Sequence, residues 1–278
     1  MSVALSLVDL SACERLAAER LLRRVSAVNH QPLPEDTQTL WIAGRPCGHL
    51  LPGIREQIAQ SALAAWFVDT DTGVLFSPEA SLNEALATVA RRFHEAGYFF
   101  QWRNELLDVL PLEGETPVAQ AERGLFRYLG LRTRCVYAVG ITPDARFYLC
   151  RRSLTKQVDP GLWDVLAAGL MAASETPELS LRREIREEAG LNEGDYVLLS
   201  DRRRFTVRRP VEEGWMFEEA FAVNVRVDRP EAVHNIDGEV IAIECRRVHE
   251  LLARIEADEV PSDTAIAFLS ALVPHTES

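Results

Sequence analysis

The sequence predicts a protein of mixed helices and strands, in the α/β or α+β class, and three observations support this expectation. Helical periodicity is present near the start, in the centre and at the end of the chain. Short β-type runs lie between these helical stretches. Of the 278 residues, 47% are hydrophobic, which is enough for one large core or two modest ones.

The N-terminal part has the patterns of a small α+β unit. Residues 9–29 predict an amphipathic helix, because Ser11 and Glu14 have the spacing of a capping box. A second such box opens at Ser81 and predicts a helix that ends at Gly97. Three strand-like runs lie between the two helices, at residues 39–42, 65–68 and 74–76.

A polar stretch that contains glycine and prolines, PLEGETP, predicts a domain boundary. We expect residues 1–114 to form an N-terminal domain of unknown role and residues 115–278 to form a second domain that folds on its own. The elements expected in the second domain are a helix at 119–128, strands at 135–139, 147–150, 196–199, 205–208 and 217–227, a strand that starts at 237–240, and a helix at 262–272.

A central helix has the most informative pattern. The stretch that starts at Gly169 reads GLMAASETPELSLRREIREEAGL, and Leu181, Ile185 and Ala189 form an apolar stripe at i, i+4 and i+8. Gly190 suits the left-handed residue that commonly ends a helix. We therefore expect one face of this helix to pack on a core.

Three carboxylates lie beside that apolar stripe. Glu184, Glu187 and Glu188 fall within an arc of about 100° on the helix surface. Carboxylates packed so closely repel one another and raise each other's pKa values. A hard divalent cation such as Mg²⁺ removes the repulsion and prefers oxygen ligands. Taken by itself, however, a glutamate cluster on a helix is more often a solvated face.

The spacing of the whole stretch resembles the signature of the Nudix hydrolase family, G-x5-E-x7-R-E-U-x-E-E-x-G-U, in which U is an aliphatic residue. Gly169, Glu175 and the run from Arg183 to Leu191 fill every specified position, which favours a metal site over a solvated face. The resemblance implies an α/β/α sandwich with a mixed sheet, preceded by the smaller α+β domain. It also implies Mg²⁺-dependent hydrolysis of a phosphoanhydride in a diphosphate linked to an organic moiety.

The resemblance assigns roles to the residues that would hold the metal. It implies that Glu184, Glu187 and Glu188 bind Mg²⁺, with Mn²⁺ as a substitute, and that the carbonyl of Gly169 joins them. Glu184 is also a candidate base for the attacking water. Metal ions suit this reaction because charge develops on the phosphate oxygens during hydrolysis.

Arg183 and Glu175 are implied to hold the helix and the loop before it together. Two neighbouring residues depart from the family's usual glycines: Ser174 precedes Glu175, and Ala168 precedes Gly169. We therefore expect a stiffer loop at this point than is usual in the family.

Candidate substrate contacts lie outside the signature. Arg151, Arg152 and Lys156 are candidate phosphate ligands, because a guanidinium fork fits phosphate oxygens; charges at a strand end are equally often only solvated. Trp163 is a candidate for the wall of the site, although an aromatic residue beside Pro-Gly more often packs in a core. Glu239 stands where the superfamily sometimes supplies a further carboxylate, and a plain surface glutamate is nearly as common.

Shorter motifs resemble one branch of the family, which joins an N-terminal domain of uncharacterised role to a Nudix domain and is related to the Nudix part of some thiamin pyrophosphokinases. These motifs lie at residues 102–106, 122–123, 152–156, 160–164 and 237–240. The branch implies thiamin diphosphate or its oxidised derivatives as substrates, cleaved to the monophosphate. The alternatives are an ADP-ribose-like nucleoside diphosphate derivative, a non-catalytic metabolite-binding module, and an isopentenyl diphosphate isomerase that uses Cys150.

The charge and the cysteine content limit the kinds of partner and the cellular compartment that we expect. A formal net charge of −12 argues against nucleic acid or an anionic membrane and leaves a small-molecule diphosphate as the expected partner. The start of the chain does not resemble a signal peptide, and no apolar run is long enough to span a membrane. The five cysteines are odd in number and never spaced C-x-x-C, which favours reduced thiols. We expect a cytoplasmic monomer or homodimer.

Overall fold

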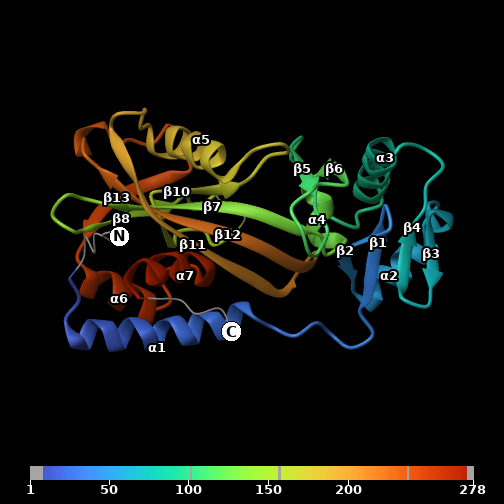
Figure 1. Cartoon of the computed structure of the whole chain (residues 1–278), viewed down its shortest axis with the longest axis horizontal. Coiled ribbons are helices and arrows are strands. Elements are labelled where there is room, and N and C mark those ends of the chain that lie inside the picture. The colour runs from blue at the N-terminus through green and yellow to red at the C-terminus, as the bar shows by residue number, and fades with distance from the viewer. Residues whose placement is uncertain (1–8, 101, 156–157, 237, 274–278) are drawn as a thin grey trace.

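The computed structural model describes residues 9–100, 102–155, 158–236 and 238–273. Its largest element is a mixed sheet in the order β11-β12-β7-β8-β13, with β10 beside β7 and β9 beside β8 (Figure 1). Strands β12 and β7 run parallel, whereas β11 and β12 run antiparallel. The strands are β7 (Arg132–Ile141), β8 (Phe147–Arg152), β9 (Trp163–Asp164), β10 (Ala167–Leu170), β11 (Tyr196–Val211), β12 (Gly214–Val227) and β13 (Val240–Arg246).

Helices cover both faces of this sheet. Figure 1 shows α5 on one face and α6 and α7 on the other. The helices are α5 (Pro177–Ala189), α6 (Val248–Glu256) and α7 (Ser262–Leu272), with a 3-10 turn η2 (Pro230–Ala232) before β13. The predicted apolar stripe of α5 is buried at Leu181, Ile185 and Ala189, and Gly190 ends the helix with a φ of 70°. The predicted α/β/α sandwich is therefore confirmed.

The first helix, α1 (Ala12–Asn29), packs on the sandwich. Its capping box forms from Ser11 and Glu14, as predicted. Figure 1 shows α1 alongside α6 and α7, and its buried side chains share their core. These side chains are Ala18, Leu21, Leu22 and Val25. In the described ranges, neither α1 nor any other helix is long and apolar enough to cross a membrane.

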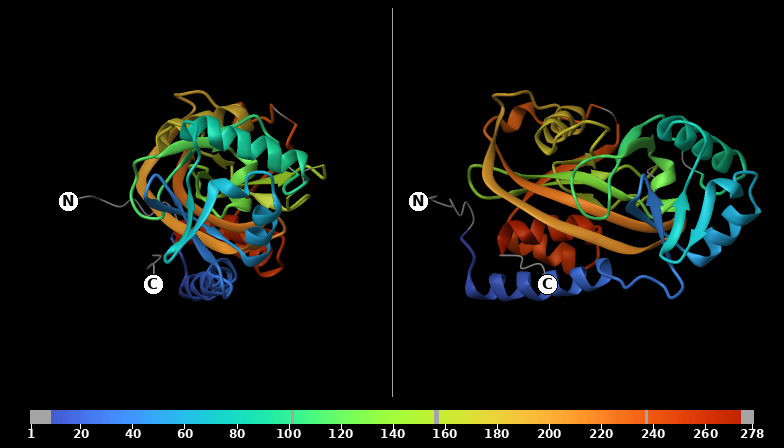
Figure 2. Two further views of the ribbon diagram at one scale, coloured as in Figure 1. Left: turned by 90° about the vertical axis from the view of Figure 1, so that its right-hand side faces the viewer. Right: turned by 45° about the vertical axis from the view of Figure 1, so that its right-hand side comes forward.

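A smaller α+β unit lies at one end of the sandwich (Figure 2). Its sheet has the order β2-β1-β4-β3, in which β1 and β4 run parallel. A separate hairpin, β5–β6, and the short helix α4 connect this unit to β7. The elements are β1 (Gln38–Ile42), β2 (Arg45–Leu50), α2 (Pro52–Gln60), η1 (Ala64–Trp66), β3 (Phe67–Thr70), β4 (Gly73–Phe76), α3 (Leu82–Glu95), β5 (Leu106–Val109), β6 (Ala119–Glu122) and α4 (Gly124–Tyr128).

The two hydrophobic cores do not divide at the predicted boundary between residues 114 and 115. Phe126, Leu129 and Leu131 pack in the core of the smaller unit, together with residues such as Leu40. In the other direction, α1 packs in the core of the sandwich. The predicted boundary therefore does not coincide with the division between these cores, because burial of apolar side chains joins α4 to the first unit and α1 to the second.

Two predicted secondary-structure elements also differ from those in the structure. The stretch 119–128 was expected to be one helix, but Ala119–Glu122 pairs with β5, and only α4 is helical. Ala119 and Ala121 are both buried, as alternate positions of a strand are when one face is covered. The strands expected at 196–199 and 205–208 are one strand, β11, with an irregular register between Leu198 and Arg202.

Candidate active site

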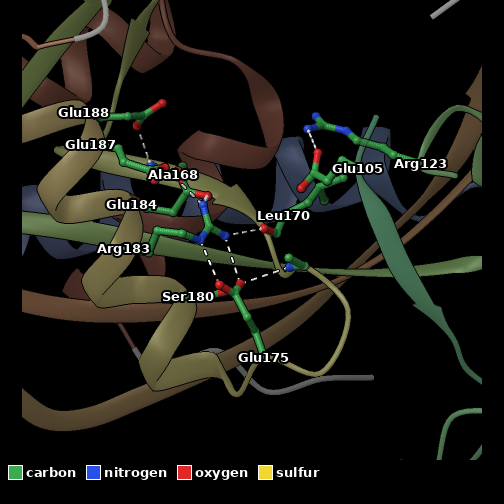
Figure 3. Close-up of polar contacts among 11 residues, drawn as sticks. Glu105, Arg123, Ala168, Leu170, Glu175, Ser180, Arg183, Glu184, Glu187 and Glu188 are labelled. Carbon is green, nitrogen blue, oxygen red and sulfur yellow. Dashed lines mark hydrogen bonds and ion pairs between the residues drawn. The ribbon is translucent and has the colours of Figure 1, made fainter. Parts of the chain in front are cut away.

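Arg183 on α5 ties the helix to the loop before it (Figure 3). Its Nε donates to Glu175 Oε1 at 2.8 Å, and its Nη2 donates to Glu175 Oε2 at 2.9 Å. Nη2 also donates to the carbonyl oxygen of Leu170 at 3.1 Å. The Arg183 guanidinium holds the pKa of Glu175 at about 2, so this carboxylate is charged at neutral pH. The structure thus brings together the two residues that the signature pairs.

The loop before α5 is also held by the hairpin β5–β6. The N–H of Ala173 donates to the carbonyl oxygen of Leu106 at 2.8 Å, and the N–H of Ser174 donates to Asp108 Oδ2 at 2.9 Å. Gln120 Nε2 donates to Ser174 Oγ at 3.3 Å. Ser174 has a φ of 68°, a left-handed conformation that favours glycine. The hairpin therefore fixes the residue at which this sequence departs from the family's usual glycine.

The three signature carboxylates are all hydrogen-bonded. Arg183 Nη1 donates to Glu184 Oε1 at 2.6 Å and to Glu187 Oε2 at 3.2 Å. Glu188 Oε2 accepts from the N–H of Ala168 at 2.9 Å. Glu184 is only 8% exposed, and burial raises its pKa. A raised pKa makes an ionised carboxylate a stronger proton acceptor.

Gly169 lies directly against Glu184. A Cβ at position 169 would stand 2.1 Å from Glu184 Oε1, far inside contact distance. Gly169 is part of β10, which pairs with β7, so its backbone is held in place. A side chain at position 169 would therefore displace the Glu184 carboxylate from its present place.

These carboxylates fit a hard divalent cation by their chemistry, because Mg²⁺ and Mn²⁺ prefer oxygen ligands. Within the described ranges, no three His, Cys, Asp or Glu side chains gather closely enough to hold a metal ion in the present arrangement. The reason is that Glu184 and Glu187 both turn towards Arg183. The Glu187 side chain is 55% exposed. The three carboxylates line one cavity, and their chemistry suits the cation.

The carboxylates line a cavity of 840 Å³. Its wall includes the α5 carboxylates with β10, the residues Glu105 and Arg123 that flank the hairpin β5–β6, and residues of α4, β7, β8 and β12. Among the predicted substrate contacts, Arg152 and Glu239 line the cavity. The Arg152 guanidinium is already engaged, since Nη1 donates to Asp164 Oδ2 at 2.5 Å and both Nε and Nη2 donate to the carbonyl oxygen of Val158. Arg152 therefore has little capacity left for phosphate.

The other predicted substrate contacts lie elsewhere. Arg151 is not among the described residues that line the cavity, because successive strand residues face opposite sides and its neighbour Arg152 faces inwards. Trp163 is 7% exposed, packs in the core of the sandwich, and has the Arg254 guanidinium 4.2 Å from its ring centroid. These positions contradict the expectation that Arg151 and Trp163 contact the substrate. Lys156 lies outside the described residues.

Sequence reasoning missed a second acidic group in the cavity wall, which consists of Asp159, Glu218 and Asp263. Glu218 on β12 is 7% exposed, and burial raises its pKa. Cys135 Sγ donates to Glu218 Oε1 at 3.1 Å, and Tyr137 Oη donates to Asp263 Oδ2 at 3.2 Å. The available signal in the sequence was a pair of glutamates inside the apolar run WMFEEAFAV.

We expect Glu175→Gln to lower the free energy of unfolding by about 2–3 kcal/mol at pH 7, because the pair with Arg183 depresses the pKa of Glu175 from 4.5 to about 2. A depressed pKa stabilises the fold fully above the unfolded value and loses that effect as the pH falls towards about 2. The difference between variant and wild type should therefore shrink at pH 3. Urea unfolding at both pH values measures it. The exposed pair Arg92–Glu95 supplies the control, because Glu95→Gln should change stability by less than about 0.5 kcal/mol.

Comparison with known proteins identifies the domain that carries this site. Residues 131–266 match the NUDIX domain family. An uncharacterized Nudix hydrolase of Streptomyces coelicolor is 37% identical over 87 residues, which are 31% of this chain and 48% of that protein. The nucleoside triphosphatase NudI of an Enterobacter species is 32% identical over 98 residues, 35% of this chain and 59% of that protein. The chain thus spans about half the length of the curated relatives it matches.

The chain is also similar to a solved structure from Deinococcus radiodurans. That structure is 24% identical, has a TM-score of 0.45, and covers 59% of this chain and 97% of its own. Its likeness concerns the fold alone. Residues 131–266 of this chain match the NUDIX domain family, and within that region the protein is similar to Nudix hydrolases.

Proposed function

We propose that this protein is a divalent-metal-dependent hydrolase that cleaves a phosphoanhydride bond in a small diphosphate linked to an organic moiety. The observation that supports this most is that the signature carboxylates Glu184, Glu187 and Glu188 line one cavity together with Gly169. A binding module without catalysis would gain little from three carboxylates that repel one another. A bound divalent cation would offset this repulsion, and it would also bind the phosphate groups of a substrate.

Each residue of the signature has a task in this proposal. A bound Mg²⁺ or Mn²⁺ would offset the charge that develops on the phosphate oxygens. Glu184, the most buried of the three carboxylates, takes a proton from the attacking water. Arg183 and Glu175 fix α5 against its loop, so the carboxylates keep their positions during the reaction. Gly169 leaves the space that Glu184 occupies.

The second acidic group supports a substrate whose organic moiety carries positive charge or N–H donors. Glu218 and Asp263 accept hydrogen bonds from neutral groups, the thiol of Cys135 and the hydroxyl of Tyr137. The thiazolium and aminopyrimidine rings of thiamin diphosphate have this character. We therefore propose thiamin diphosphate or an oxidised derivative as the substrate, with the monophosphate as product.

A substrate panel tests this assignment. With Mg²⁺ at neutral pH, we expect kcat/KM for an oxidised thiamin diphosphate to exceed the values for ADP-ribose and for nucleoside triphosphates, with phosphate release as the assay. The Glu188→Gln protein, prepared in the same way, measures contaminating phosphatases. If ADP-ribose were turned over about tenfold faster than every thiamin derivative, the thiamin substrate would be rejected. The assignment as a hydrolase would be kept. Thermal stabilisation by ligand without any turnover would indicate a binding module.

An ADP-ribose-like nucleoside diphosphate derivative is the second candidate. The relative NudI is named a nucleoside triphosphatase. An isomerase that uses Cys150 is disfavoured, because that thiol is 3% exposed and burial raises its pKa well above the ordinary value. We further propose that the protein acts in the cytoplasm as a monomer or homodimer, which cell fractionation and sedimentation can measure.

A further inference from the structure

Two residues that precede the NUDIX domain, Glu105 and Arg123, line the same cavity as the signature carboxylates. They meet where the hairpin β5–β6 ends. The N–H of Arg123 donates to the carbonyl oxygen of Glu105 at 2.9 Å, and Arg123 Nη1 donates to Glu105 Oε2 at 2.8 Å. Figure 3 shows this pair across the site from Glu184 and Glu187. The cavity wall therefore contains an ion pair that the domain itself does not supply.

Hydrogen bonds hold the backbone on both sides of the Glu105–Arg123 pair. The hairpin is bonded to the signature loop through Ala173 and Ser174. On its other side, the carboxylate of Glu122, 4% exposed, accepts a hydrogen bond from the N–H of Arg103 at 2.8 Å. The backbone on both sides of the pair is thus anchored, which is what precise placement of a binding group requires.

The pair shares its cavity with both groups of carboxylates. Glu105 and Arg123 line the same wall as the signature carboxylates Glu184, Glu187 and Glu188, and Glu218 lines it as well. A diphosphate bound by the signature carboxylates would therefore occupy the cavity that Arg123 lines.

Arg123 also has guanidinium nitrogens that make no hydrogen bond to the described residues, unlike two other arginines of the cavity. All three guanidinium nitrogens of Arg183 and of Arg152 donate to protein oxygens. In Arg123 only Nη1 does so, and its Nε and Nη2 have no hydrogen-bond partner among the residues that the structure describes. Its side chain is 38% exposed. A guanidinium edge of this kind matches two phosphate oxygens.

We propose that Arg123 binds the diphosphate of the substrate and that Glu105 is the positioning residue that orients the Arg123 guanidinium. This inference rests on the proposed function, because it assumes a diphosphate beside the signature carboxylates. It places part of the substrate-binding machinery outside residues 131–266.

The first test measures binding by the full-length protein. Methylenediphosphonate, a diphosphate analogue that cannot be hydrolysed, is titrated with Mg²⁺ present in a calorimeter. We expect Arg123→Gln to weaken its binding by about 30-fold and Arg123→Lys to recover part of that loss, because lysine keeps the charge without the fork. Arg92→Gln, which removes an arginine from a surface pair on α3, is the control and should bind as the wild type does. Melting temperatures establish that each variant is folded.

The second test asks whether Glu105 acts through Arg123. Glu105→Gln should raise KM by about threefold to tenfold with little change in kcat, and the double variant with Arg123→Gln should bind no more weakly than Arg123→Gln alone. Equal effects of Glu105→Gln in both backgrounds would show an independent role and overturn the positioning assignment. Wild-type binding by Arg123→Gln would overturn the inference and leave the proposed function intact. Binding of the analogue by a wild-type protein without hydrolase activity would reject the proposed function only, and no binding by the wild type would reject both.

Discussion

Glu187→Gln and Glu188→Gln should each lower kcat by at least about 100-fold while the fold survives. Both carboxylates line the cavity, and neither is fully buried, so the change removes charge without opening a hole in the core. A glutamine at position 188 can still accept the hydrogen bond from the N–H of Ala168 through its amide oxygen. Removal of divalent cations with a chelator should lower the wild-type rate in the same way. Steady-state phosphate release measures both effects.

Another glutamate of α5 provides the matched control. Glu178 lies in the first turn, pairs with Arg182 and Arg202, and is not among the described residues of the catalytic cavity. Glu178→Gln should therefore keep kcat within about twofold of the wild type. Near-wild-type turnover by Glu187→Gln or Glu188→Gln would show that the metal assignment is wrong.

A fragment of residues 115–278 should fail to unfold cooperatively. It lacks α1, so the core of the sandwich loses Leu21 and Val25. It also exposes the side chains of α4 and its surroundings, such as Phe126, which pack against the missing unit. Each large apolar side chain that leaves a core loses about 1.5–3 kcal/mol of burial free energy. The sum over several such side chains is comparable with the free energy of unfolding of a typical domain, roughly 5–15 kcal/mol. Urea unfolding followed by circular dichroism measures the outcome.

Two leucines of α1 test the same point in the intact chain. Leu21 is 1% exposed and Leu16 is 66% exposed on the same helix. Leu21→Ala should lower the free energy of unfolding by about 2–5 kcal/mol, whereas Leu16→Ala should change it by less than about 0.5 kcal/mol. A cooperative, stable fragment 115–278 together with a mild effect of Leu21→Ala would restore the boundary that the sequence suggested.

Local patterns in the sequence predicted the sandwich and the signature helix. The apolar stripe of α5, the glycine that ends it and the spacing from Gly169 to Glu188 depend on residues near one another in the chain. For that reason the sequence alone was enough to anticipate the meeting of Glu175 with Arg183. The close approach of Gly169 to Glu184 then explains why that glycine belongs to the pattern.

Contacts between distant segments could not be predicted in this way. Periodicity shows that α1 has an apolar face, yet it does not say which core that face joins. Strand β2 was missed because Pro46 and Gly48 are unfavourable in strands. In the structure, Gly48 is needed for close packing, since a Cβ there would stand 2.5 Å from the carbonyl oxygen of Leu129. Trp163 was a candidate for the wall of the site with core packing as the commoner alternative, and in the structure it is buried in the core of the sandwich.

The contacts of Ser174 have a consequence for how the two parts of the chain communicate. This residue adopts a backbone conformation that favours glycine, its bonds to Asp108 and Gln120 hold it there, and the next residue is the partner of Arg183. A substrate whose binding depends on how Glu175 and Arg183 hold α5 must therefore favour the docked hairpin. By thermodynamic reciprocity, the docked hairpin must raise the affinity for that substrate by the same factor. The N-terminal unit is then an effector of the active site that is built into the same chain.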